Sequence, residues 1–206
     1  MSTRALPVSI FLIAALAAMP PLAVDAYLPA MPSIAASLMA DIHDVELSLS
    51  LFLAGFAIGQ LIGGPFSDRF GRRKAIGLGI GFFLIGSLVI VLSGSIEWLW
   101  AGRVIQALGG GLAVVNASAI IRDVSSGKDS ALLMSHMAII MMLAPLLAPT
   151  LGMLLMKLGG WRSIFIFLVV YAAALVTTLY FRLPETRIKS AVPVNVWQRY
   201  KMVLTH

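Results

Sequence analysis

The chain has 206 residues, of which 60% are hydrophobic, and it carries a formal net charge of +6 and no cysteine. Soluble domains contain about 45–50% apolar residues, so this composition favours a membrane protein. The lack of cysteine excludes a disulfide framework and thiolate chemistry. A basic balance can indicate nucleic-acid binding, but the positions of the charges argue against that interpretation.

Six apolar runs follow one another, each close to or above the roughly 20 residues that span a bilayer. They cover residues 6–27 (with an extension to 38 as an alternative), 45–64, 75–93, 98–121, 131–156 and 164–183. The runs are apolar all round, whereas strands of a membrane barrel alternate with a period of two. Because backbone polar groups in lipid must be satisfied internally, we expect an all-α polytopic membrane protein with six transmembrane helices.

Positive charge is concentrated in alternate connections between the runs. With the amino terminus inside, most of the 15 lysines and arginines fall in inner segments, including a cluster at residues 69–74. The outer loops hold only Lys157 and Arg162. This bias is the positive-inside rule, so the charge reports orientation. We therefore expect a multi-pass protein of the cell inner (plasma) membrane with a cytoplasmic amino terminus.

The first run has a second interpretation. Residues 1–26 have an early arginine, an apolar core and an end rich in small residues, which resembles a cleaved signal peptide. The apolar stretch continues beyond this point, however, and is interrupted only by Asp25. It also contains Pro20, Pro21 and Pro29. We therefore favour a long, tilted span that is kinked by its prolines.

Two domains are predicted, a six-helix bundle over residues 1–185 and a truncated basic linker over 186–206. In the linker, Val196, Trp197 and Tyr200 fall on one helical face, which is typical of an amphipathic segment on the inner membrane surface. Within the bundle, glycines recur at four-residue spacing in the second and third spans. Small residues at this spacing let helix backbones approach closely, so we interpret most of these glycines as packing positions.

Two ionisable residues lie within the spans, Asp25 in the first and Arg103 in the fourth. A charge at a helix centre costs about 2.5–3.5 kcal/mol on insertion scales, so such residues face the bundle interior and are functional candidates. Both fall in the outer half of the membrane, where they could share a cavity, and a purely structural ion pair is the alternative. Burial favours the protonated form of a carboxyl group and a nearby arginine the ionised form, a balance suited to proton exchange.

Further polar and proline residues in the spans carry weaker signals. Pro145 and Pro149 each lack a backbone donor, so we expect them to kink the fifth span. Polar side chains in the spans could line a cavity, although bonds between helices are the favoured interpretation; these are Gln60, Gln106, Asn116 and His136. Trp98, Trp100 and Trp161 lie at outer boundaries and are interpreted as membrane-interface anchors.

No catalytic motif is present in the sequence. It contains no phosphate-binding loop, no metal-ligand spacing of histidine, glutamate and cysteine, and no hydrolase elbow. We therefore expect neither an enzyme nor a metal site, and no cofactor other than a proton gradient.

Three stretches resemble motifs of the major facilitator superfamily. "GGPFSDRFGRRKA" resembles motif A, which lies between the second and third helices, with Phe66 in place of a leucine. The matched residues of motif A are Gly64, Asp68, Arg69, Gly71, Arg72 and Arg73. "RVIQALGG" resembles motif B of the fourth helix, matching Arg103 and Gln106. "APLLAPTLG" resembles motif C of the fifth helix, containing Pro145 and matching Pro149 and Gly152.

The first helix narrows the resemblance to one branch of this superfamily. "DAYLPAMP" resembles the first-helix signature of proton-driven drug exporters and places Asp25 at its acidic position. "RLPET" is a usual end of their sixth helix. Together these stretches are similar to the Bcr/CflA (bicyclomycin and chloramphenicol resistance) drug:proton antiporters.

The resemblance covers only one half of that architecture, which has twelve helices in two six-helix halves, each a 3+3 inverted repeat. It implies proton-coupled efflux of small amphipathic drugs, with Asp25 accepting protons and cationic substrate and Arg103 tuning it. Motif A would latch the outward-open state, and the kinked fifth helix would line the interface with a missing carboxyl-terminal half or a second copy. An uptake symporter and a non-transporting truncated fragment or assembly partner are the alternatives.

Overall fold

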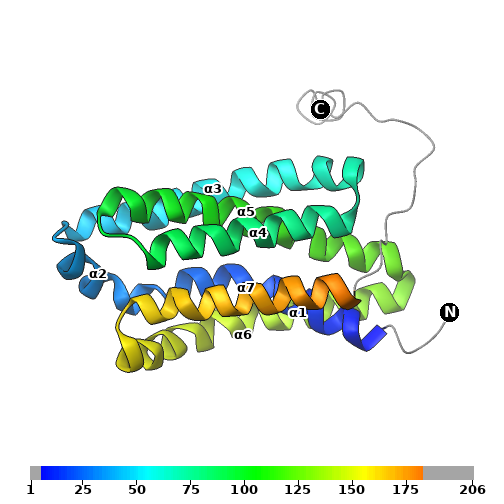
Figure 1. Ribbon diagram of the computed structural model, residues 1–206. Helices are drawn as coiled ribbons and strands as arrows, with labels where there is room; N and C mark the ends of the chain where they lie inside the picture. The colour runs from blue at the N-terminus through cyan, green and yellow to red at the C-terminus, as the bar shows by residue number, and fades with distance from the viewer. Residues whose placement is uncertain (1–5, 183–206) are drawn as a thin grey trace, which may run out of the picture.

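The computed structural model describes residues 6–182, which are helical apart from short connections (Figure 1). The helices are α1 (Leu6–Asp25), the 3-10 turn η1 (Leu28–Ala30), α2 (Met31–Leu38), α3 (Ile42–Phe70), α4 (Arg72–Val91), α5 (Ile96–Val124), α6 (Gly127–Gly159) and α7 (Arg162–Arg182). Six segments are long and apolar enough to cross a membrane, and α1, η1 and α2 together form the first. All six predicted spans are confirmed, whereas the predicted linker, 186–206, lies outside the described residues.

The helices form two groups, α3–α4–α5 and α1–α6–α7 (Figure 1). The packing has an approximate two-fold pattern. The second span, α3, packs on the fourth, α5, as the fifth, α6, packs on the first, α1. The third span, α4, also packs on α5, as the sixth, α7, packs on α1. This correspondence between the first three and the last three spans is what a 3+3 repeat requires.

Close packing around α5 depends on glycine. A Cβ atom at Gly86 of α4 would overlap the backbone nitrogen of Gln106, and one at Gly111 of α5 would overlap the carbonyl oxygen of Phe56. The interpretation of the glycines as packing positions therefore holds for α5 and its neighbours. It does not hold for Gly81, where an added Cβ would meet no atom within 4 Å.

The spans differ greatly in how much of their apolar surface the bundle covers. In the most apolar 18-residue window of each span, 72% of α5 is buried but only 11% of α6 and 28% of α3. Large aliphatic side chains of α6 such as Leu146 and Met142 are exposed. The outer faces of α6 and α3 therefore require cover from lipid or from another protein surface.

The first span is broken rather than gently kinked. Pro20 and Pro21 lie inside α1, and the break comes after Asp25, where the chain turns through η1 into α2. In a continuous helix the amide of residue 29 would donate to the carbonyl of residue 25, and Pro29 has no such amide. Leu16 and Met19 of α1 are fully buried in the bundle core, which favours a transmembrane span over a signal peptide.

Candidate functional site

The break after Asp25 exposes carbonyl oxygens at the carboxyl end of α1, and Arg103 of α5 occupies that end. Arg103 is fully buried, and its Nη1 donates to the carbonyl oxygen of Ala23 at 2.9 Å. The last carbonyls of a helix have no partner within the helix, and its dipole favours a cation there. Arg103 therefore caps α1, a role that its position in the sequence does not reveal.

The same Nη1 atom donates to Oε1 of Gln106 at 2.9 Å, so the two residues of motif B act together. Gln106 is also fully buried, and its Nε2 donates to the hydroxyl of Ser87 in α4 at 2.8 Å. A polar chain thus runs from α1 through α5 to α4. The interpretation of Gln106 as a bond between helices is confirmed.

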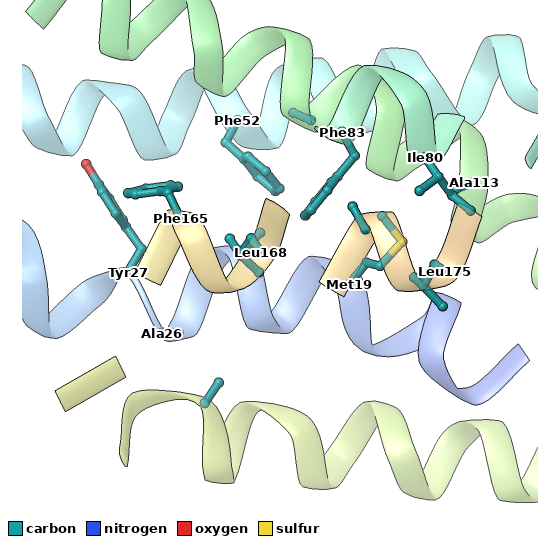
Figure 2. Close-up of a cluster of buried hydrophobic side chains, with 14 of the residues drawn as sticks. Met19, Ala26, Tyr27, Phe52, Ile80, Phe83, Ala113, Phe165, Leu168 and Leu175 are labelled. Atoms are coloured by element: carbon teal, nitrogen blue, oxygen red, sulfur yellow. The ribbon is translucent and has the colours of Figure 1, made fainter. Parts of the chain in front are cut away.

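Three aromatic rings surround the Arg103 guanidinium, and we call Tyr27, Phe52 and Phe165 the arginine box. The guanidinium carbon lies 4.4 Å from the ring centroids of Tyr27 and Phe52 and 5.9 Å from that of Phe165. Figure 2 labels the three rings, which come from the α1–η1 junction, α3 and α7. Such geometry permits cation–π attraction at a fully buried guanidinium. No motif predicted the box, because its rings come from three separate spans.

Two of the rings are fixed by further contacts. The Tyr27 hydroxyl lies 2.7 Å from the Ser48 hydroxyl, with which it shares a hydrogen bond, and donates to the carbonyl of Val45 at 3.3 Å. Phe165 packs edge-on against Tyr27 and against Trp161, with centroids 5.9 and 6.1 Å apart. Trp161 is only 3% exposed, so its predicted role as a membrane-interface anchor is wrong. Trp98 is 62% exposed, and its role as an interface anchor stays a prediction.

Asp25 is half-buried at the last position of α1. The ion pairs found over residues 6–182 do not include Asp25 with Arg103, so the structural pair considered from the sequence is absent. The charge of Arg103 is instead met by two neutral oxygens and three ring faces. Asp25 and Arg103 are nevertheless joined through the backbone, because Ala23 is two residues from Asp25.

Motif C, in α6, packs against the same break after Asp25. A Cβ atom at Gly152 of α6 would overlap the carbonyl oxygen of Ala26, so only glycine lets α6 approach the break this closely. Helix α6 continues through Pro145, which is exposed, and Pro149, which is half-buried. The Arg103–Gln106 pair and Gly152 therefore converge on the residues around Asp25.

Motif A forms a tighter structure than the loop expected from the sequence. Asp68 and Arg69 lie in the last turn of α3, and Arg72 begins α4, so Gly71 alone connects the two helices. Gly71 has φ of +101°, a backbone conformation that residues other than glycine rarely adopt. Its amide donates to the carbonyl of Ser67 at 2.9 Å, which ends α3.

Arg72 is the centre of the motif A contacts. It pairs with Asp68 at 2.9 Å, and its Nε donates to Oδ2 of Asp123 at 2.9 Å. Its Nη1 also donates to the Ser67 hydroxyl at 2.6 Å. Asp123, near the end of α5, was missed in the sequence. The signal available was its place at the end of the fourth span that lies on the same side of the bundle as motif A.

The other residues of motif A differ in how they contact this bundle. Arg73 donates to the carbonyl of Tyr180 near the end of α7 at 2.8 Å and lies over the Tyr180 ring. Arg69 is exposed and lies over the ring of Phe70. A Cβ atom at Gly64 would meet nothing within 4 Å, so this glycine does not serve packing within the described bundle.

The remaining polar residues of the spans do not form a common cavity. Asn116 is buried and donates to the carbonyl of Leu112 in its own helix. Gln60 and His136 are exposed on the bundle surface. Within residues 6–182 no group of three or more histidine, aspartate and glutamate side chains is placed to hold a metal ion.

Comparison with known proteins gives consistent matches over this bundle. A family model described as Major Facilitator Superfamily matches residues 6–204. An uncharacterised MFS-type transporter, YdgK of Bacillus subtilis, is 39% identical over 193 residues, covering 90% of this chain and 48% of that protein. A bicyclomycin resistance protein homolog of Haemophilus influenzae is 34% identical, covering 88% and 46%, respectively. The multidrug resistance protein MdtL of Escherichia coli is 36% identical, covering 85% and 44%.

Solved structures match the fold at lower sequence identity. A proton:xylose symporter, XylE, superposes with a TM-score of 0.74 at 21% identity, covering 86% of this chain and 45% of that one. A peptide transporter, POT, superposes with a TM-score of 0.75 at 18% identity, covering 95% and 42%. The chain thus spans about half the length of the curated relatives and solved structures that it matches.

Proposed function

Because this chain belongs to the major facilitator superfamily, we propose that it is the amino-terminal half of a proton-coupled multidrug efflux transporter of the cell inner membrane. The relatives named for bicyclomycin and multidrug resistance, at 34% and 36% identity, support drug export. The observation that carries the proposal is the half-buried Asp25 at a helix break, where a buried arginine binds the carbonyl of Ala23 and does not pair with Asp25.

Asp25 is the proposed acceptor of protons and of cationic substrate. An ionisable side chain in a membrane span is functional by default, and transporter binding sites lie at broken helices near the midplane. A carboxylate without an arginine partner can accept either a proton or a cation, and one binding event excludes the other. Such competition couples proton entry to drug release without a further cofactor, since the proton gradient supplies the free energy.

The motif A residues are the proposed conformational latch. Arg72 is anchored within this half by Asp123, whereas Asp68 is largely exposed, with 58% of its side chain accessible. An exposed carboxylate at the inner end of α3 is available to a second surface in one state and to water in another. We propose that this surface belongs to a carboxyl-terminal half, which would also cover the exposed faces of α3 and α6. With Arg72 and the other inner charges facing the cytoplasm, the amino terminus is cytoplasmic in this proposal.

The test of the proposed function is Asp25→Asn in a full-length version that joins this chain to a carboxyl-terminal half. We expect proton-driven drug export to be lost, because asparagine can neither take up a proton nor bind a cation by charge. Asp129→Asn, which makes the same chemical change at an exposed position of α6, is the control and should export normally. Resistance that persists in Asp25→Asn cells at equal expression would refute the assignment.

An uptake symporter of the same superfamily is the second candidate. The xylose symporter is similar in fold alone, and the relatives in sequence are named for resistance. Inverted vesicles separate the two candidates, since a proton gradient drives an exported dye into their lumen and an imported substrate out of it. Vesicles that contain only the 206-residue chain distinguish a working pair of copies from a half that needs its complement.

A further inference from the structure

The arginine box surrounds a buried positive charge that has few hydrogen-bond partners. Arg103 is fully buried, and only one of its terminal nitrogens, Nη1, has hydrogen-bond partners. Its Nε and Nη2 atoms are buried without a partner, although the half-buried Asp25 lies two residues from Ala23, to which Arg103 donates. A buried guanidinium with unused donors could pair with a carboxylate, so the position of Arg103 on the Ala23 carbonyl calls for a structural feature that stabilises it there.

The three ring faces provide that feature. A cation over an aromatic face gains about 2 kcal/mol or more where water is excluded, and Tyr27 and Phe52 lie on the guanidinium at 4.4 Å each. The Ser48 hydroxyl fixes the Tyr27 ring to α3, and Trp161 packs against Phe165. The box is therefore a rigid holder assembled from the first, second and sixth spans around a side chain of the fourth.

We propose that Tyr27, Phe52 and Phe165 are positioning residues that keep Arg103 on the Ala23 carbonyl and away from the Asp25 carboxylate. Asp25 is thereby left available for protons and for cationic substrate. This inference rests on the proposed role of Asp25. Opening the box would let Arg103 turn its unused Nε and Nη2 edge toward Asp25 and neutralise the site.

The 206-residue chain in lipid nanodiscs allows a direct test with two side-chain reagents. Phenylglyoxal modifies accessible arginines, and a hydrophobic carbodiimide labels protonated carboxyl groups in membranes. Mass spectrometry of one digest measures the modification of Arg103 and of Asp25, with the exposed Arg122 as the internal reference. In the unmodified sequence we expect Arg103 to be protected and Asp25 to be labelled.

Phe52→Leu removes a ring face while keeping an apolar side chain. We expect labelling of Asp25 to fall by at least about tenfold, because the released guanidinium pairs with the carboxylate and keeps it ionised. Modification of Arg103 should rise only as far as the lost ring admits the reagent. Phe165→Leu should act in the same direction but less strongly, since its ring is farther from the Arg103 guanidinium. If Phe52→Leu does not fold, Phe165→Leu replaces it in the test. Phe52→Tyr keeps the ring face and should restore both rates.

Phe83→Leu is the matched control, because Phe83 is as deeply buried as Phe52 and lies in the same core but is not a member of the box (Figure 2). Equal changes in Phe83→Leu and Phe52→Leu would overturn the proposal, since loss of packing would then explain them. Arg103 modification that rises while Asp25 labelling stays constant would overturn it as well. Export that survives Asp25→Asn would refute the proposed function while leaving these labelling rates unaffected, so the two failures are distinguishable.

Discussion

Asp123→Asn tests whether Arg72 joins α4 to α5 inside this half. Arg72 and Asp123 are only 14% and 16% exposed at their side chains, and their bond is 2.9 Å long. A hydrogen bond to a charged group contributes about 1.5–3 kcal/mol to stability. Asparagine retains a neutral acceptor oxygen and also removes an unfavourable negative charge from the end of α5, worth about 0.3–1 kcal/mol. We therefore expect Asp123→Asn to lower the free energy of unfolding by about 1–2 kcal/mol.

Asp68→Asn is the matched comparison, because Asp68 also bonds Arg72 at 2.9 Å and also lies in the last turn of its helix. Its side chain is 58% exposed, and exposed pairs four residues apart contribute about 0.3–0.5 kcal/mol. We expect little loss of stability from Asp68→Asn, but slower conformational cycling in a full-length transporter with substrate binding retained. The assay for stability is equilibrium unfolding of the 206-residue chain in mixed micelles of increasing SDS content.

Asp68→Asn that destabilises the chain as much as Asp123→Asn would show that both carboxylates hold the bundle together. The distinction between Asp123, a buried anchor, and Asp68, a solvent-exposed latch residue, would then be wrong. Weakened substrate binding with normal turnover in Asp68→Asn would separately contradict the proposed latch.

Gly152→Ala should destabilise the bundle by about 1–3 kcal/mol, because its Cβ would overlap the Ala26 carbonyl; Gly81→Ala, with open space, should be neutral or stabilising in the same SDS titration. Comparable stability of the two variants would contradict the close approach of α6 to the break. Arg162→Gln should speed amide exchange at the end of α4 by at least about fivefold, because Arg162 donates to the carbonyls of Val91 and Ser93 at 3.1 and 2.7 Å. Exchange as slow as in the exposed-site control Lys157→Gln would show that this end is held by other contacts.

The spans could be predicted from the sequence because lipid leaves few alternatives. Each run of about 20 apolar residues has to be a helix. The arginines of motif A predict which side of the membrane its connection faces. The boundaries were less predictable, since α3 and α6 extend beyond their apolar runs to Phe70 and Gly159. Helix continues there because Gly71 and Gly160, both at positive φ, are the first residues at which the chain turns.

The contacts of the site were predictable only where one motif contains the interacting residues. Arg103 and Gln106 are three residues apart on α5, so their bond follows from helix geometry. The box around Arg103 and the bond from Arg72 to Asp123 join residues from different spans. Periodicity in a single span cannot reveal such contacts, because Phe52 and Phe165 are indistinguishable from other apolar core residues in sequence. The absence of an Asp25–Arg103 ion pair has the same origin, since opposite charges predict attraction but not the competing ring faces.

The two proposed functional regions, around Arg103 and around motif A, differ in how many of their partners belong to this half. The partners of Arg103, namely the Ala23 carbonyl, Gln106 and the arginine box, all belong to the described bundle, and so does the Asp123 anchor of Arg72. Gly64 and Asp68, by contrast, are oriented toward open space, as are the apolar faces of α3 and α6. The proposed proton site can therefore form in the half alone, whereas the proposed latch requires a second surface. Proton binding and conformational cycling should accordingly separate when the half is studied without its complement.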